Sequence, residues 1–373
     1  MSHIVIAGGG FAGVWAAAAA ARVRGDAGPR ITVIAPSEEM VLRPRLYETD
    51  PERAVVPLRR VLDPIGVRHL RAAVDEIDVE AQVVRAGEAE VGYDRLVLAA
   101  GSRLARPELP GARRLFDVDT IAGARRLAAH LKGRGGFTAV VVGAGFTGLE
   151  IATELAGRGR VVLVEQAEVI GPDLGPAPRP AIEAALDDLG IERRLRTTLT
   201  AVEDDAAVLS DGTRIATDTV VWAAGLRASP LTAQIPGRRD ALGRLEVDAR
   251  LRVTDPVQAV FAAGDVATVR SDAGHRVVQS CQHATPMGKT AGHNAAADLL
   301  GLPPIDFDPA PYVTDLDLGA AGALYTRGWE REVAHTGAQA KEIKRWIMER
   351  IHPPVNADRL LALAGQVNLP VPF

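Results

Sequence analysis

The stretches IVIAGGGFAG (residues 4–13) and VVVGAGFTG (residues 140–148) decide the fold of this chain. Each joins an apolar run to a GxGxxG loop, and each loop leads into a segment of helical composition. In such a loop the first glycine permits a tight turn, the second lets the backbone approach a pyrophosphate, and the third lets helix and strand pack closely. The phosphates lie on the amides at the helix N-terminus, where the helix dipole favours negative charge. Because the arrangement occurs twice, the sequence predicts two dinucleotide sites.

The residues around each loop complete a strand–helix–strand unit. The two loops are too far apart for a short structural repeat, and their spacing suits two nucleotide-binding domains. The elements expected around the loops are strands at 4–7, 31–34, 137–142 and 161–164, and helices at 14–23 and 149–156. Elsewhere the expected elements are a connecting helix at 119–131, a buried strand at 260–263, a hairpin region after Pro311 and a helix at 341–351.

The residue that ends the second strand of each unit decides how a ribose is held. In the second unit this residue is Glu165, whose carboxylate can accept hydrogen bonds from both ribose hydroxyls and would repel a 2′-phosphate. The sequence therefore predicts NADH rather than NADPH at the second loop. In the first unit the equivalent residue is Ala35, so Ser37, Glu38 or Glu39 would have to supply the polar contact.

Composition excludes several other classes of protein. A net charge of −4 and 4% aromatic residues give no reason to expect a nucleic-acid partner. Cys281 is the one cysteine, so a redox-active cysteine pair is excluded. The sequence has no secretory signal, no apolar run long enough to cross a bilayer and no cluster of metal ligands, which favours a cytoplasmic protein without a metal site.

Three further motifs identify a family. They are LVLAAGS (residues 96–102), VVWAAG (residues 220–225) and VFAAGDV (residues 260–266), in this order along the chain. With the two glycine loops, they resemble the motifs of the pyridine nucleotide-disulfide oxidoreductase superfamily of flavoproteins. In that family the last motif carries an aspartate, here Asp265, that hydrogen-bonds the ribityl chain of FAD.

This resemblance implies an α/β fold. It would consist of two Rossmann-type, glutathione-reductase-like dinucleotide-binding domains, one inserted in the other, and a small C-terminal α+β domain. We expect the FAD-binding domain in two segments, 1–118 and 243–308, and the NAD(H)-binding domain at 119–242. The C-terminal domain would then comprise residues 309–373.

Within the superfamily the chain most resembles type II NADH:quinone oxidoreductases and their relatives that are similar to apoptosis-inducing factor. Residues 146–150 (FTGLE) and 43–48 (RPRLYE) are similar to two of their motifs. Residues 281–288 (CQHATPMG) fit their AQxAxQxG motif, which lies beside the flavin and the quinone. Pro286 stands where a second glutamine is expected, and Cys281 where alanine is usual.

The resemblance assigns roles to individual residues. The residues implied for FAD are Gly8, Gly10, Phe11, Ala12, Gly13, Arg43, Val74, Ala100, Gly101, Gly264, Asp265 and Ala284. Those implied for NAD are Gly143, Gly145, Phe146, Thr147, Gly148, Glu165, Ala224 and Gly225. Gln282, Glu150 and His283 are the expected catalytic residues.

The implied function is a ping-pong transfer of hydride from NADH to FAD, followed by transfer of two electrons to a quinone-like acceptor. Two alternatives stay open: an NADH-dependent ferredoxin reductase, and an NADH-sensing flavoprotein of low turnover. The ferredoxin reductases usually carry a FWSDQ-type aromatic segment, which this sequence lacks.

The segment 341–352 has apolar residues at helical spacing with Lys344, Arg345 and Arg350 on other faces. It could be an interfacial helix on the inner face of the membrane, which is how type II NADH:quinone oxidoreductases use their C-terminal part. The reading we favour is an amphipathic helix that packs on its own domain or on a second copy of the chain in a homodimer. Glu342 and Glu349 dilute its basic face.

Overall fold

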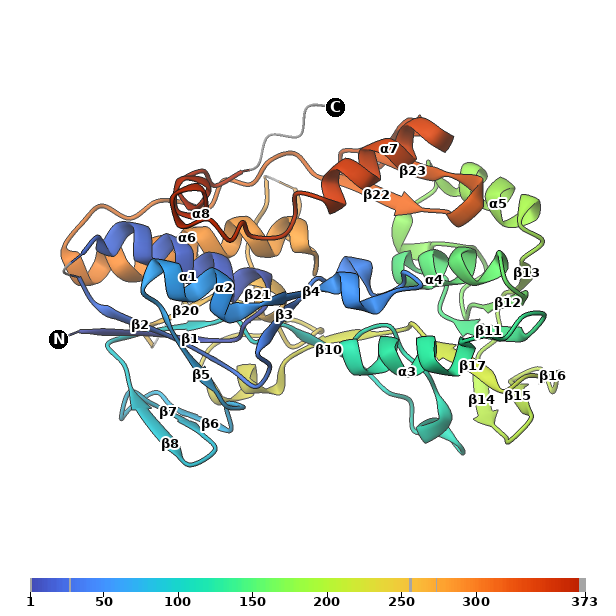
Figure 1. The fold of residues 1–373 in the computed structure, drawn as a ribbon, viewed down its shortest axis with the longest axis horizontal. Coiled ribbons are helices and arrows are strands. Elements are labelled where there is room, and N and C mark those ends of the chain that lie inside the picture. Colours follow the sequence, from blue (N-terminus) through green and yellow to red (C-terminus); the bar gives the residue numbers. More distant parts are fainter. Residues whose placement is uncertain (1, 27, 255–256, 273, 369–373) are drawn as a thin grey trace.

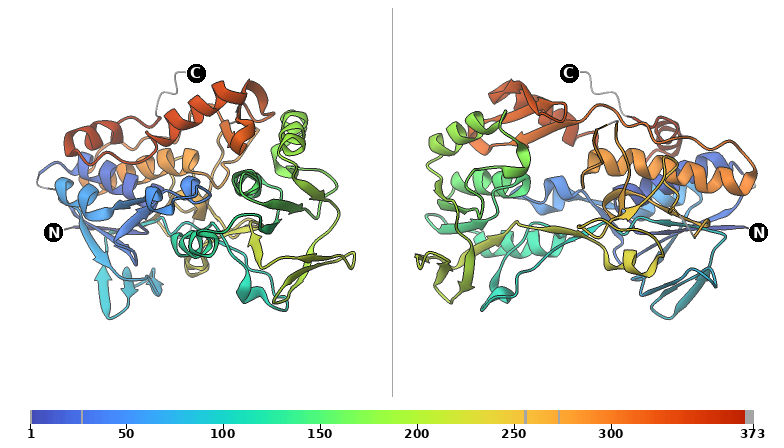
Figure 2. Two further views of the ribbon diagram at one scale, coloured as in Figure 1. Left: turned by 45° about the vertical axis from the view of Figure 1, so that its right-hand side comes forward. Right: turned by 180° about the vertical axis from the view of Figure 1, so that it is seen from behind.

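The computed structural model describes residues 2–26, 28–254, 257–272 and 274–368. Two α/β units lie beside each other, and the C-terminal segment runs along one side of both (Figures 1 and 2). Each unit is built on a parallel sheet, which confirms the expected fold class. Within the described ranges, no helix is both long and apolar enough to span a bilayer.

The first unit contains a five-stranded parallel sheet in the order β20-β9-β1-β2-β5. Four of its strands come from the first hundred residues, but β20 and the helix α6 come from the second half of the chain. The unit is therefore assembled from two distant segments, with the second unit between them in sequence. Its main elements are β1 (His3–Ala7), α1 (Phe11–Arg24), β2 (Arg30–Ala35), β5 (Arg68–Arg71), β9 (Arg95–Leu98), β20 (Val260–Ala262) and α6 (Cys281–Leu300).

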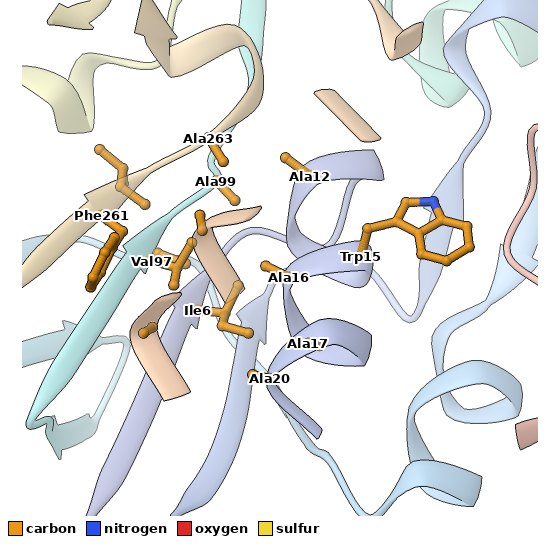
Figure 3. Close-up of a cluster of buried hydrophobic side chains, with 14 of the residues drawn as sticks. Ile6, Ala12, Trp15, Ala16, Ala17, Ala20, Val97, Ala99, Phe261 and Ala263 are labelled. Atoms are coloured by element: carbon orange, nitrogen blue, oxygen red, sulfur yellow. The ribbon is translucent and has the colours of Figure 1, made fainter. Parts of the chain in front are cut away.

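Small residues let α1 and α6 pack backbone to backbone. A Cβ atom on Gly288 would lie 2.3 Å from the carbonyl oxygen of Ala12, and one on Gly292 would lie 2.0 Å from that of Ala16. Figure 3 shows Ala16 and Ala20 of α1 on the side of Ile6, while Trp15 points away from the sheet. The alanine-rich sequence of α1 thus serves close packing on two sides, because a larger side chain would separate the layers.

The second unit has a four-stranded parallel sheet in the order β13-β12-β11-β17 and a small antiparallel sheet, β14-β15-β16. The two chain crossings between the units, β10 and β18, pair with each other as antiparallel strands. This pairing is the geometry expected where one unit is inserted in another. The elements are β10 (Ser102–Leu104), α3 (Ile121–Leu131), β11 (Thr138–Val142), α4 (Phe146–Ala156), β12 (Arg160–Val164), α5 (Arg179–Asp188), β13 (Glu192–Arg194), β14 (Leu199–Val202), β15 (Ala206–Leu209), β16 (Arg214–Ala216), β17 (Thr219–Trp222) and β18 (Leu226–Ala228).

The C-terminal segment divides into two parts. Strands β22 (Val313–Asp317), β23 (Ala323–Arg327) and β24 (Glu332–Thr336) form an antiparallel sheet that packs on α4 and carries α7 (Gly337–Met348). The helix α8 (Ala357–Ala364), which the sequence did not lead us to expect, packs instead on α1. Leu360 and Ala364 of this helix join the hydrophobic core of the first unit.

Short elements connect these layers. They are β3 (Glu39–Val41), β4 (Val55–Pro57), α2 (Leu58–Leu62), β6 (Glu76–Asp78), β7 (Val83–Ala86), β8 (Ala89–Gly92), β19 (Leu245–Glu246) and β21 (Ala267–Thr268).

The helix α7 begins and ends three to four residues earlier than the 341–351 expected from its apolar pattern. It buries Ala340 and Ile343 against its own sheet, where they pack with Ala323 and Tyr325. One expectation was wrong: Lys344 is not part of an exposed basic face, because its side chain is only 4% exposed and forms a buried ion pair. Arg345 and Arg350 are exposed.

Candidate functional site

The first glycine loop joins β1 to α1. A Cβ atom on Gly8 would lie 2.1 Å from the carbonyl oxygen of Ala99, and one on Gly13 would lie 1.9 Å from that of Gly8. A Cβ atom on Gly10, in contrast, would meet no atom within 4 Å. Two glycines are thus required by the packing of the protein, whereas Gly10 leaves its side of the helix N-terminus open for a ligand.

The second glycine loop repeats this geometry between β11 and α4. A Cβ atom on Gly148 would lie 1.7 Å from the carbonyl oxygen of Gly143, and one on Gly143 would lie 3.0 Å from the Cβ atom of Ala224. Phe146 and Thr147 form the first turn of α4. The loop therefore presents a helix N-terminus at the carboxyl edge of a parallel sheet, as a dinucleotide site requires.

Segments that follow the neighbouring strand reach each loop. Ala100 and Gly101 lie two and three residues after the end of β9, and Ala224 and Gly225 lie at the same distance after β17. Gly101 has φ +67° and Gly225 has φ +79°, a conformation that favours glycine. The two motifs predicted from LVLAAGS and VVWAAG thus occupy equivalent places in the two units.

The two ribose positions differ, as the sequence indicates. Glu165 follows β12, is 7% exposed and accepts hydrogen bonds from the N–H groups of Ala144 and Ala167, each at 2.8 Å. Each carboxylate oxygen can accept further bonds, so the side chain can still hold ribose hydroxyls. In the first unit, Ala35 ends β2, and Glu38 forms an exposed ion pair with Arg71 at 2.9 Å.

A network of polar side chains surrounds Asp265, which lies in the second of the two chain segments that form the first unit. Ser102 donates its hydroxyl to Asp265 at 2.6 Å, and Arg43 lies 3.3 Å from the same carboxylate oxygen. Arg43 also pairs with Asp119. The network brings together three separate parts of the chain beside Gly264. Val74, which was also expected at the FAD site, is half-buried after β5 and packs against the core of the first unit.

The helix α6 begins at the meeting point of these segments. A Cβ atom on Gly264 would lie 2.9 Å from the Cβ atom of Ala12 and 3.5 Å from that of Ala284. The expected acceptor motif therefore adjoins the first glycine loop. Gln282, in the first turn of α6, donates its side-chain amide to the carbonyl oxygen of Pro311 at 3.3 Å.

His283 is buried, with an exposed fraction of 1%. Its ring stacks on Tyr312 at 5.5 Å between ring centroids, and on Trp329 at 5.9 Å. Burial lowers the pKa of His283 to about 4, so the imidazole is neutral at physiological pH. Its Nδ1 atom lies 3.3 Å from the N–H of Val278, whereas its Nε2 atom has no hydrogen-bond partner among the described residues.

Glu150 in α4 forms a buried ion pair that joins the second unit to the C-terminal segment. Lys344 in α7 lies 2.9 Å from its carboxylate, and both side chains are 4% exposed. Lys344 also donates to the carbonyl oxygen of Asp315 at 2.8 Å, and its ammonium lies 5.6 Å from the ring centroid of Phe146. Burial raises the pKa of Glu150 to about 7, against the opposing effect of Lys344.

Sequence reasoning missed Lys344, Asp315, Asp317 and Tyr47 as neighbours of the site. Asp317 accepts a hydrogen bond from Tyr47 at 3.2 Å, and its backbone N–H donates to Glu150 at 3.2 Å. A hollow of about 440 Å³ opens beside this group and is lined by Tyr47, Asp317 and Lys344 among others. No pattern in the sequence signals this role: Lys344 directly follows Ile343, and successive residues of a helix point in different directions.

Two further observations limit the chemistry of the site. Burial raises the pKa of the Cys281 thiol to about 12, so the reactive thiolate is disfavoured at neutral pH. In the described part of the chain, no three His, Cys, Asp or Glu side chains gather as a metal site would require.

The residues present fit two dinucleotides. Both glycine loops pack closely through their first and third glycines, and Gly10 is open on the side where a pyrophosphate would lie. The loops belong to sheets in different units. The Arg43, Ser102 and Asp265 network supplies the donors and acceptors that a ribityl chain requires.

Comparisons with known proteins agree with this geometry. The chain is 46% identical to a NADH dehydrogenase-like protein of Mycobacterium tuberculosis, over 98% of each chain. It is 30% identical to a type II NADH:quinone oxidoreductase of the same organism, over 77% of this chain and 71% of that one.

Among solved structures, the water-forming NADH oxidase from Lactobacillus brevis bound to NADH matches with a TM-score of 0.77 and 20% identity, over 92% of this chain and 77% of that one. At this identity the likeness shows the fold alone. The pyridine nucleotide-disulphide oxidoreductase family matches residues 2–288, more than half of the chain. Together with the relatives, this match confirms the resemblance found in the sequence: the chain belongs to the pyridine nucleotide-disulphide oxidoreductase family.

Proposed function

We propose that this FAD- and NAD(H)-binding oxidoreductase transfers two electrons from NADH to a quinone-like acceptor. The proposal rests on one observation: the first turn of α6, with Gln282 and His283, adjoins Gly264 and the first glycine loop. An acceptor beside that turn would lie next to the flavin. A relative named as a type II NADH:quinone oxidoreductase, 30% identical, supports a quinone as that acceptor.

In this proposal the second unit would bind NADH and the first unit would bind FAD. Gly143, Gly145 and Gly148 would hold the pyrophosphate of NADH, and Glu165 its adenosine ribose. The first glycine loop, Asp265 and the amides at the start of α6 would hold FAD. When bound, FAD accepts hydride from NADH and passes the two electrons on.

The overall reaction also needs a proton. NADH, one proton and a quinone give NAD⁺ and a quinol, so one proton must come from the medium. Glu150 would hold it, because burial raises its pKa to about 7 and Lys344 keeps the side chain in place. Lys344 and Asp317, which both donate a hydrogen bond to Glu150, line the adjoining hollow.

Gln282 would orient the acceptor. Its amide hydrogen bond to Pro311 is long, at 3.3 Å, and can be exchanged for one to a quinone carbonyl. Pro286 is buried in α6 and has no side-chain donor, so it cannot supply the contact that a glutamine makes in the family motif.

The test is steady-state oxidation of NADH with short-chain ubiquinone and menaquinone analogues. Gln282→Ala should lower kcat with quinones about two- to tenfold, since one hydrogen bond contributes roughly 0.5–1.5 kcal/mol. The rate of flavin reduction by NADH, measured without acceptor, should not change. Pro286→Gln should maintain or raise quinone turnover.

Gln258→Ala is the matched control, because Gln258 is exposed and lies outside the site. It should behave as the unmodified protein. A reduced ferredoxin formed faster than any quinol would move the assignment to a ferredoxin reductase. A flavin that NADH reduces but no acceptor reoxidises quickly would indicate an NADH sensor.

A further inference from the structure

No helix or strand holds the linker between α6 and β22. Residues 303–312 form this linker, and four of them are prolines, which have no backbone N–H to donate: Pro303, Pro304, Pro309 and Pro311. The position of the linker therefore depends on its contacts with other parts of the chain.

The end of this linker covers the first turn of α6. The carbonyl oxygen of Pro311 accepts a hydrogen bond from the side-chain amide of Gln282 at 3.3 Å. The ring of Tyr312 stacks on that of His283 at 5.5 Å between centroids. Gln282 and His283 belong to the turn beside which the proposed function places the acceptor. A displacement of the linker would therefore change how both side chains are held.

Asn368, in the tail that follows α8, holds the linker just before this point. Its side-chain oxygen accepts from the N–H of Ala310, and its side-chain amide donates to the carbonyl oxygen of Asp308, each at 2.8 Å. One side chain thus pairs with a donor and an acceptor of the linker backbone, as a neighbouring strand would. Ala310 lies between two prolines, so its N–H is the donor that this part of the linker can offer.

Lys289 fastens the same tail to α6. Its Nζ atom donates to the carbonyl oxygen of Gln366 at 2.8 Å and lies 4.3 Å from the ring centroid of Trp15. The residue is 1% exposed. Burial lowers the pKa of Lys289 to about 8, and no carboxylate among the described residues pairs with its ammonium. A buried cation without such a partner costs stability, which points to a role in the nearby site.

Both contacts lie along one face of α6. Gln282 and Lys289 are seven residues apart, close to two helical turns, so their side chains project from the same side of the helix. Gln282 meets the linker there, and Lys289 meets the tail two turns further on. Since Asn368 joins the linker to the tail, contacts run without a break from Lys289 to Gln282.

We propose that Lys289 and Asn368 are positioning residues of the acceptor site: they hold the tail and the linker so that Gln282 faces an incoming acceptor. The inference rests on the proposed function, in which Gln282 orients that acceptor. The bond from Gln282 to Pro311 fixes the direction of the amide before the acceptor binds. A side chain that is oriented in advance loses less entropy on binding, which favours electron transfer to the acceptor.

The test compares variants of the FAD-loaded protein in steady-state assays with NADH and a short-chain menaquinone analogue. Asn368→Ala and Lys289→Met should each lower kcat/KM for the quinone about two- to tenfold, the range for losing one hydrogen bond. The value of kcat/KM for NADH should stay within about twofold, because the proposed NADH site lies in the other unit. Gln366→Ala is the matched control, since Gln366 is exposed and alanine keeps the backbone carbonyl that Lys289 contacts.

Coupling to Gln282 separates positioning from a general loss of stability. In the Gln282→Ala background, Asn368→Ala should have almost no further effect on kcat/KM for the quinone, because its effect acts through Gln282. Independent effects that multiply in the double variant would overturn the proposal. A kcat/KM for the quinone that is unchanged in both Asn368→Ala and Lys289→Met would also overturn it.

Hydrogen exchange tests the same inference without any acceptor. Lys289→Met should raise the exchange rate of the Ala310 amide at least threefold, although Lys289 does not contact Ala310, because the tail that holds this amide is released. Gln366→Ala should leave the rate unchanged. Unchanged exchange at Ala310 in Lys289→Met would overturn the proposal. Raised exchange, with quinones that reoxidise the flavin of every protein no faster than oxygen does, would support this inference and contradict the proposed quinone acceptor.

Discussion

Replacing Lys344 by methionine should destabilise the protein strongly and in a pH-dependent way. Lys344 is the buried counter-charge of Glu150 at 2.9 Å and lies 3.7 Å from the carboxylate of Asp315. Methionine fills a similar volume, so the change removes the charge with little change in packing. The buried carboxyl group of Glu150 and the half-buried one of Asp315 then remain beside each other without this cation.

The magnitude follows from burial. Both members of the pair are 4% exposed, and removing one partner of such a pair costs about 3–5 kcal/mol of unfolding free energy. An exposed cation contributes far less, so Arg345→Met on the same helix should change stability by no more than about 0.5 kcal/mol. The double variant Glu150→Gln/Lys344→Met should recover at least half of the loss, because it leaves no unpaired Glu150 carboxylate.

The sign of the pH dependence is fixed by the direction of the pKa change. The folded protein raises the pKa of Glu150 from 4.5 to about 7 through burial, and loss of Lys344 would raise it further. A carboxyl group with a raised pKa binds its proton more tightly in the folded state, so its contribution to stability is greatest below pH 4.5 and is lost as the pH rises. The deficit of Lys344→Met should therefore be larger at pH 8 than at pH 5.

The assay is urea unfolding followed by tryptophan fluorescence at pH 5, 6.5 and 8, for the unmodified protein and the three variants. A loss below about 1 kcal/mol at pH 8, or a loss that is the same at all three pH values, would refute the reasoning. A double variant less stable than Lys344→Met would refute the assignment of Glu150 as the partner.

Four further variants have expected outcomes. Gly288→Ala should lower unfolding free energy by about 1–3 kcal/mol in thermal denaturation, since its Cβ would meet α1, whereas Gly10→Ala should leave the apoprotein stable and weaken FAD binding in a flavin titration. Glu165→Ser should reduce a preference for NADH over NADPH of roughly 100-fold in kcat/KM, mainly by impairing NADH. The depressed pKa of His283 should cost stability as the pH falls from 6.5 towards 4, so His283→Asn should flatten the acid limb of a stability-pH profile; an unchanged limb would contradict this.

Local chemistry let the sequence predict the fold. The strands β1 and β11 and the helices α1 and α4 follow from apolar runs that end in glycine loops. Each of these patterns involves only residues that are close together in the sequence. The close approach of Gly8 and Ala99, or of Gly143 and Ala224, is what the motif requires sterically. These features are short-range, or they belong to a motif with one known geometry.

Contacts between distant segments could not be predicted in the same way. Lys344 has the pattern of a surface lysine, and only the packing of the C-terminal sheet, which carries α7, on α4 makes it the partner of Glu150, 194 residues away. The stack of Trp329 on His275 and Tyr312 likewise depends on how the C-terminal hairpin lies across both units. The helix α8 has a clear apolar face, but its place on α1 follows from tertiary packing.

Double-mixing stopped flow tests whether a quinone takes the electrons from the reduced flavin. The FAD-loaded protein is first reduced with one equivalent of NADH without oxygen, and is then mixed with a short-chain menaquinone analogue, with ferredoxin or with dissolved oxygen. We expect rapid bleaching of the flavin absorbance by NADH and reoxidation by the quinone that is much faster than reoxidation by oxygen. Reoxidation by quinones that is no faster than by oxygen would contradict it.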